Sequence, residues 1–162
     1  GIGGGFVSPA GVFTGFSGAA TEIGHLVVDP LGPRCVCGQY GCLEAMASGT
    51  AIARQASERS GRLLSTRQVF ALAADGDTVC RTVVADAAAA VGAGLASVSQ
   101  LFDPQGIVLG GSVALHNPEF VELVGRELAS RIAGREVPQL AVAGLGADAG
   151  ILGAALLPES AS

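Results

Sequence analysis

Apolar residues recur at helical spacing over one long stretch in the second half of this chain. They fall three and four residues apart and form one continuous stripe, made of Val84, Ala88, Val91, Leu95, Val98 and Phe102. This periodicity predicts a helix that begins after Asp77 and ends at Asp103-Pro104. Gly92 and Gly94 would each weaken it by roughly 1 kcal/mol relative to alanine. We therefore expect a neighbouring element to pack closely against these two glycines.

Shorter patterns predict further elements on both sides of this helix. Turn residues between two apolar pairs predict a hairpin around Ser8–Gly11. The other expected helices cover 43–60 with a break at Ser48-Gly49, 66–74 with Thr66 as the cap, 117–133 behind Asn117-Pro118, and 148–157. The expected strands cover 25–28, 106–109 as a buried strand, and 140–143. Strands and helices alternate in the second half, which predicts an α/β fold with a mostly parallel sheet there.

Composition and charge exclude several classes of partner. The 162 residues are enough for one domain with a core of its own. The formal net charge is −5, which argues against a nucleic-acid partner for this segment because phosphate binding needs a basic face. Residues 1–10 lack a secretory pattern, and the most apolar stretch, 87–99, is short for a bilayer span. We expect a cytoplasmic protein with no membrane contact.

Three of the four cysteines and one of the two histidines lie in one short segment. Zn²⁺ prefers four tetrahedral ligands drawn from thiolate and imidazole groups. Cys35, Cys37 and Cys42 from a loop, with His25 from the preceding strand, supply that set, so we predict a structural zinc with no open position. The alternative is three thiols in a loop without a metal. Cys80, on the long helix, is expected to be a small buried residue.

Two glutamates, Glu22 and Glu44, flank the predicted zinc-binding segment of about 22–44. They could be a solvated glutamate and a helix N-terminal glutamate that the helix dipole favours. They could instead be fixed acceptors for the hydroxyls of a sugar, since such acceptors discriminate strongly between hydroxyl positions. The spacing leaves both interpretations open.

Two glycine runs could let backbone amides approach a phosphate group. The first is Gly3, Gly4 and Gly5; glycine makes up 25 of the 162 residues, so a short run of this kind is weak support. The second, Gly110-Gly111, follows a predicted strand, at the sheet edge where open α/β sheets bind ligands. Neither run is a Walker motif, because no Gly-Lys-Ser/Thr follows.

Together these motifs resemble the ROK family (repressor, open reading frame, kinase). The matching segments are Gly1–Gly5, Glu22–His25, Cys35–Glu44, Asp103–Ser112 and Asp148–Ala155, and the resemblance covers essentially the whole chain. It implies the C-terminal lobe of an actin-like, ribonuclease H-like ATPase fold with an inserted zinc-binding loop. Residues 1–162 would form this single lobe, and the N-terminal lobe would lie outside this chain.

The resemblance also implies a function. A ROK sugar kinase would transfer the γ-phosphoryl group of ATP, with Mg²⁺, to a hexose or N-acetylhexosamine, with N-acetylmannosamine and glucose as candidates. The implied sugar ligands are Glu22, His25 and Glu44, with His25 also on the zinc. The implied nucleotide contacts are Gly3, Gly4 and Gly5 at the phosphates and Gly110 and Gly111 at the adenosine. The catalytic base would lie in the N-terminal lobe, so we expect this chain alone to be inactive. A homo-oligomer is also implied, and the alternative function is the sugar-sensing domain of a ROK repressor.

Overall fold

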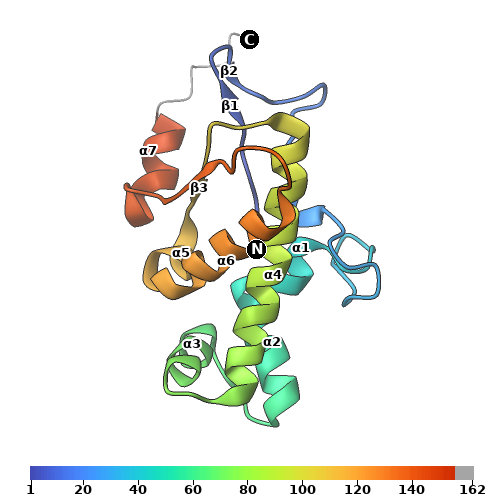
Figure 1. Cartoon of the computed structure of the whole chain (residues 1–162), viewed down its shortest axis with the longest axis vertical. Helices are drawn as coiled ribbons and strands as arrows, with labels where there is room; N and C mark the ends of the chain where they lie inside the picture. The colour runs from blue at the N-terminus through green and yellow to red at the C-terminus, as the bar shows by residue number, and fades with distance from the viewer. Residues whose placement is uncertain (156–162) are drawn as a thin grey trace.

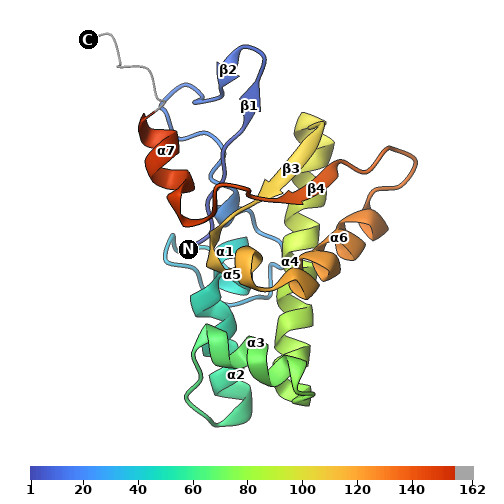
Figure 2. The ribbon, with the colours of Figure 1, turned by 90° about the vertical axis from the view of Figure 1, so that its left-hand side faces the viewer.

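A long central helix organises the fold in the computed structural model, which describes residues 1–155 (Figure 1). This helix, α4 (Thr78–Phe102), confirms the longest element predicted from the sequence, and the Asp77 carboxylate caps it by accepting a hydrogen bond from the Cys80 amide over 3.0 Å. Around α4 pack α1 (Leu43–Ala47), α2 (Gly49–Ser60), α3 (Thr66–Ala74) and α6 (Pro118–Arg131). Figure 2 shows α6 beside one half of α4 and α2 with α3 beside the other.

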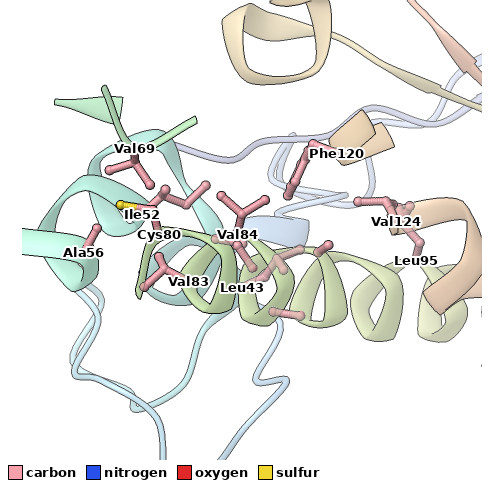
Figure 3. Close-up of a cluster of buried hydrophobic side chains, with 14 of the residues drawn as sticks. Leu43, Ile52, Ala56, Val69, Cys80, Val83, Val84, Leu95, Phe120 and Val124 are labelled. Atoms are coloured by element: carbon pink, nitrogen blue, oxygen red, sulfur yellow. The ribbon is translucent and has the colours of Figure 1, made fainter. Parts of the chain in front are cut away.

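The hydrophobic core lies along the faces of α4 that these helices cover (Figure 3). Its largest fully buried side chains are Leu43, Ile52, Leu128, Val69, Val83, Val124, Cys42 and Cys80. Several helices surround α4, so its buried face is wider than the predicted stripe and includes Val83 and Ala87, whereas Phe102 at the stripe's end is 37% exposed. Cys80 is fully buried, which confirms the expected small buried residue, and this burial raises the pKa of its thiol.

The two glycines of α4 mark close helix contacts, as predicted. A Cβ added to Gly92 would lie 2.4 Å from the Cβ of Glu127 on α6. A Cβ added to Gly94 would lie 2.9 Å from a methyl carbon of Leu43 on α1. The weak helix propensity at these positions is therefore offset by neighbours that could not approach a larger residue so closely.

Two small sheets complete the described part of the chain. Strands β1 (Val7–Ser8) and β2 (Gly11–Val12) pair antiparallel and confirm the predicted hairpin. Strands β3 (Gly106–Leu109) and β4 (Gln139–Val142) pair parallel, with Gly106 opposite Gln139. The prediction that 106–109 is a buried strand was wrong: Ile107 and Leu109 are half-buried against the core, but Val108 is 67% exposed.

The predicted strand at 25–28 was also wrong. Residues Ile23–His25 form a short 3₁₀ helix, η1, in which the His25 amide donates to the Glu22 carbonyl and the Leu26 amide to the Ile23 carbonyl. Only Val27 pairs as in a sheet, through a single bridge to Cys42. The local turn satisfies the backbone groups that a strand would have left for a partner.

Other boundaries differ in detail. The break at Ser48-Gly49 between α1 and α2 is confirmed. Ser65, not Thr66, caps α3, because the Thr66 hydroxyl donates to the Gly49 carbonyl instead. A short helix that the pattern did not predict, α5 (Gly111–His116), precedes α6, and the Asn117 side chain donates to the Val113 carbonyl rather than capping α6.

The last described elements are η2 (Gly146–Asp148) and α7 (Ala149–Ala155). The helix predicted at 148–157 therefore begins where expected, and its last two positions lie outside the described residues. Among those residues, α4 alone is long and apolar enough to cross a bilayer, with a mean hydropathy of 1.5 over its most apolar window. Because 56% of that window is buried in the molecule, the core packing of α4 accounts for its composition.

Candidate functional site

The predicted zinc ligands come together in the fold. One ligand atom from each of His25, Cys35, Cys37 and Cys42 lies within 4.8 Å of all the others. The His25 Nδ1 is 3.6 Å from the Cys35 Sγ, and the Cys37 Sγ is 3.5 Å from the Cys42 Sγ. In a tetrahedral zinc site, two sulfurs are about 3.8 Å apart, and a sulfur and an imidazole nitrogen about 3.5 Å. These four side chains could therefore hold one Zn²⁺.

A tight loop between residues 29 and 42 places the three thiols. The Cys35 amide donates to the Gln39 carbonyl and the Gly38 amide donates back to the Cys35 carbonyl, which folds the chain around Cys37. Gly38 and Gly41 have φ values of +94° and +68°, in the left-handed region that favours glycine. The Gly41 carbonyl accepts from the amides of residues 28 and 29, so the end of the loop is held against its beginning.

The thiols differ in their electrostatic surroundings. Cys37 is exposed, and hydrogen bonding, first to the backbone of Gln39, lowers the pKa of its thiol. Burial, followed by the neighbouring Cys37 thiol, raises the pKa of the Cys42 thiol to about 12. A buried thiol of this kind is ionised only with a nearby positive charge, and a coordinated metal ion supplies that charge. The geometry of the four side chains, rather than these pKa shifts, is what makes them a candidate metal site.

Glu44 lies beside this cluster, in the first turn of α1 and two residues after Cys42. Its Oε2 accepts a hydrogen bond of 2.8 Å from the backbone amide of Ile2, forty-two residues away. The other carboxylate oxygen, Oε1, is left for a further donor. Glu22 is exposed and directly precedes η1, which ends at His25.

The first glycine run reaches the same place. The carbonyl of Ile2 packs on Gly24 so closely that a Cβ there would lie 2.0 Å from the oxygen. The Thr21 hydroxyl donates to the Gly4 carbonyl over 2.9 Å. A Cβ on Gly3 or Gly5 would meet nothing within 4 Å, so the backbone beside them is open. The fold thus joins the candidate phosphate loop to the segment that carries Glu22 and His25.

The second glycine run occupies another part of the fold. Gly110 follows β3 and precedes the first turn of α5, and Gly111 has a φ of +84° with open space where a Cβ would stand. This is the carboxyl end of a parallel strand, as the sequence predicted. The sequence analysis missed two residues of the site. Ile2 contributes its backbone amide, which every residue type except proline has, and Thr21 has a positive φ that no sequence pattern indicates.

Comparison with known proteins identifies the family. The ROK family matches residues 1–161, and the chain belongs to this family, as its motifs indicated. It is 42% identical over 159 residues to an N-acetylmannosamine kinase of Citrobacter koseri, covering 98% of this chain and 54% of that protein. It is 41% identical over 160 residues to an N-acetylmannosamine kinase of Escherichia coli O139:H28, with the same coverage. The chain spans about half the length of the curated relatives it matches.

Solved structures show the same α/β fold. A ROK hexokinase from Thermus thermophilus superimposes with a TM-score of 0.92 at 46% identity, over 96% of this chain and 53% of that one. A ROK glucokinase from Streptomyces griseus, in complex with glucose and AMPPNP, gives 0.85 at 31% identity, over 94% and 55%. A ROK transcriptional regulator, a homolog of E. coli MLC, gives 0.75 at 30% identity, over 88% and 39%.

Proposed function

We propose that the protein carrying this chain is a ROK sugar kinase, which transfers the γ-phosphoryl group of ATP to a hydroxyl of a hexose or N-acetylhexosamine. One contact supports this most directly: Glu44, a candidate sugar ligand, accepts a hydrogen bond from the amide of Ile2, the residue directly before the first glycine run. Phosphoryl transfer depends on positioning, because the acceptor hydroxyl must lie in line with the phosphate. The hydrogen bond between the Glu44 carboxylate and the candidate phosphate loop would fix the sugar relative to the phosphate.

In this proposal, Glu22, His25 and Glu44 bind the sugar. The His25 Nδ1 faces the Cys35 sulfur, which leaves Nε2 free to point elsewhere. A zinc ion bound by His25 and the three cysteines would hold this loop in one shape. With Nδ1 on the metal, the proton of the neutral ring stays on Nε2, where it can donate to a sugar hydroxyl. The free oxygen of Glu44 and the carboxylate of Glu22 would accept from hydroxyls on either side.

The nucleotide would bind to the two glycine runs. The loop of Gly3, Gly4 and Gly5, whose backbone is open at Gly3 and Gly5, would donate amide hydrogen bonds to the ATP phosphates, with Mg²⁺ neutralising their charge. Gly110 and Gly111 would lie beside the adenosine at the carboxyl end of β3. We further propose the actin-like fold of two lobes, in which the lobe outside residues 1–162 supplies the catalytic base. The 162-residue chain alone should then show no turnover.

N-acetylmannosamine is the first sugar to test, because two N-acetylmannosamine kinases are 41% and 42% identical to this chain. Glucose is the second, since the S. griseus neighbour was solved with glucose. We would measure ADP release by the full-length protein with ATP, Mg²⁺ and four sugars: N-acetylmannosamine, glucose, fructose and N-acetylglucosamine. Sugar-dependent release would establish the kinase and identify its substrate, and the better sugar would decide between the two candidates.

A matched pair of variants ties this activity to the site. Glu22→Gln removes the charge but keeps the shape, and we expect a loss of more than about tenfold in kcat/KM for the sugar, about 1.4 kcal/mol or more of transition-state binding. Glu119→Gln, at an exposed position on α6, should leave kcat/KM unchanged.

The resemblance to the ROK transcriptional regulator supports a second function, sugar sensing in a repressor. In that case the full-length protein would bind sugar and hold one zinc per chain, but would release no ADP with any sugar. Calorimetric titration with the same four sugars would detect that binding.

A further inference from the structure

Thr21 has a backbone conformation that its side chain disfavours. Its φ is +66°, and among the described residues the only other non-glycine with positive φ is Asp103, at the end of α4. The left-handed region is rare for any residue with a Cβ and is a genuine outlier for a β-branched one. Strain of this kind persists where the surrounding structure holds it in place, and it gathers at functional sites.

Two consecutive turns follow Thr21 and carry the candidate sugar ligands Glu22 and His25. The Thr21 carbonyl accepts a hydrogen bond of 2.7 Å from the Ile23 amide, across Glu22. Glu22 itself has φ −69° and ψ 56°, the values of an inverse γ-turn. The Glu22 carbonyl then accepts from His25 over 3.0 Å to form η1. Glu22 and His25 therefore lie in two consecutive turns, the first of which begins at the Thr21 carbonyl.

The Thr21 side chain reaches the other half of the site. Its hydroxyl donates to the Gly4 carbonyl, seventeen residues earlier, over 2.9 Å. Next to this bond, Ile23 packs on Gly4, where a Cβ would lie 2.7 Å from the Ile23 Cδ1. The hydrogen bond from the Ile2 amide to Glu44 holds the residue before the glycine run, and this hydroxyl holds the middle of the run.

We propose that Thr21 is a positioning residue that couples the sugar side of the site to the phosphate side. The turn at its backbone orients Glu22 towards the sugar, and its hydroxyl fixes the position of the Gly4 backbone beside the ATP phosphates. The sugar hydroxyl and the phosphate are thereby held in a fixed position relative to each other. The inference rests on the proposed kinase function. It distinguishes threonine from the two residues that could replace part of its role: glycine adopts the same φ without strain but has no hydroxyl, and valine keeps the shape but has no donor.

Three variants of the full-length protein test this. Thr21→Ser keeps the hydroxyl and should stay within about twofold of the parent in every constant. Thr21→Val should raise the KM for ATP about fivefold or more, while the KM for the sugar changes by less than about twofold. Thr21→Gly should raise both KM values, because it loses the hydroxyl and frees the turn before Glu22. Glycine adopts the positive φ of position 21 without strain, so Thr21→Gly remains informative should the valine variant fail to fold.

A second readout does not depend on catalysis. Amide hydrogen exchange of residues 2–6, followed by mass spectrometry, should be at least about threefold faster in Thr21→Val and unchanged in Thr21→Ser. Equal exchange and an equal KM for ATP in the parent and Thr21→Val would overturn the proposal, and so would equal effects of serine and valine. If the parent releases no ADP with any sugar, the kinase function fails by itself, and the exchange comparison still decides whether the hydroxyl holds the glycine run.

Discussion

Gly41 and Asp29 meet so closely that a Cβ on Gly41 would lie 1.5 Å from the Asp29 carbonyl oxygen. The Gly41 amide donates to the Pro33 carbonyl, and its φ of +68° is one that residues with a Cβ rarely adopt. Because Gly41 directly precedes Cys42, this contact closes the loop that carries the three thiols. The loop of the candidate metal centre therefore requires glycine at position 41, because any residue with a Cβ would clash with the Asp29 carbonyl.

Gly41→Ala should open this loop. We expect the free energy of unfolding to fall by about 2–4 kcal/mol, because the strain of a positive φ adds to a clash with backbone that cannot move aside. The bound zinc per chain should fall well below one. Gly38→Ala is the matched control: its φ is also positive, but its Cβ would meet nothing within 4 Å, so only about 1–2 kcal/mol should be lost. Thermal unfolding and metal analysis would measure both, and equal losses would contradict the role of the Asp29 contact.

The two histidines should differ in their effect on zinc. His25→Ala removes one of four candidate ligands and should lower the zinc retained after dialysis against a weak chelator to less than half of the parent value. His116→Ala should retain the parent amount, because His116 is exposed on α5, outside the candidate ligand set, and its ring bonds to the Ser112 carbonyl four residues before it. Full retention of zinc in His25→Ala would show that His25 is not a ligand.

The two glycines in the middle of α4 should respond differently to alanine. Gly92→Ala places a Cβ against the Cβ and backbone of α6, so we expect a loss of about 1–3 kcal/mol in the free energy of unfolding. Gly94→Ala places a Cβ 2.9 Å from a methyl carbon of Leu43, and its three nearest atoms all belong to that side chain and none to backbone. The gain in helix propensity of about 1 kcal/mol should then offset part of the crowding, so the loss should be smaller than for Gly92→Ala. Urea unfolding would separate the two, and a Gly92→Ala variant as stable as the parent would contradict the close contact of α4 with α6.

Acid should weaken the cap of α4 through Asp77. The hydrogen bond from the Cys80 amide, and then the Arg62 guanidinium, lower the pKa of the Asp77 carboxyl from 3.8 to about 2 in the folded state. The folded pKa is below the unfolded one, so this stabilisation is fully present above about pH 4 and is lost as the pH falls towards 2. The melting temperature of Asp77→Ala should therefore lie below that of the parent at pH 7 and approach it near pH 2.

Arg62→Gln is the control for that experiment. It removes the ion pair with Asp77 but leaves the amide hydrogen bond, which is the larger cause of the lowered pKa. Most of the difference in melting temperature between parent and Asp77→Ala should therefore reappear between Arg62→Gln and the double variant. If it does not, the ion pair, and not the helix cap, is the main source of the pH dependence.

Patterns that depend on local chemistry were predicted well from the sequence. The apolar period and flanking caps of α4, the turn at Pro9 and the break before Gly49 all follow from interactions within a few residues. The strand predicted at 25–28 failed because a turn held by the Glu22 and Ile23 carbonyls was formed there instead. The missed α5 is short, and no apolar period can show over six residues.

The sequence by itself determined the family, the candidate metal ligands and the lengths of the main helices, because residue type and spacing carry that information. Only the tertiary structure decided how the site is joined. The bond from Ile2 to Glu44 spans forty-two residues, and the bond from Thr21 to Gly4 spans seventeen. Such contacts leave no local period, because a backbone amide or carbonyl is the same in every residue, and packing of the whole domain selects which of them meet.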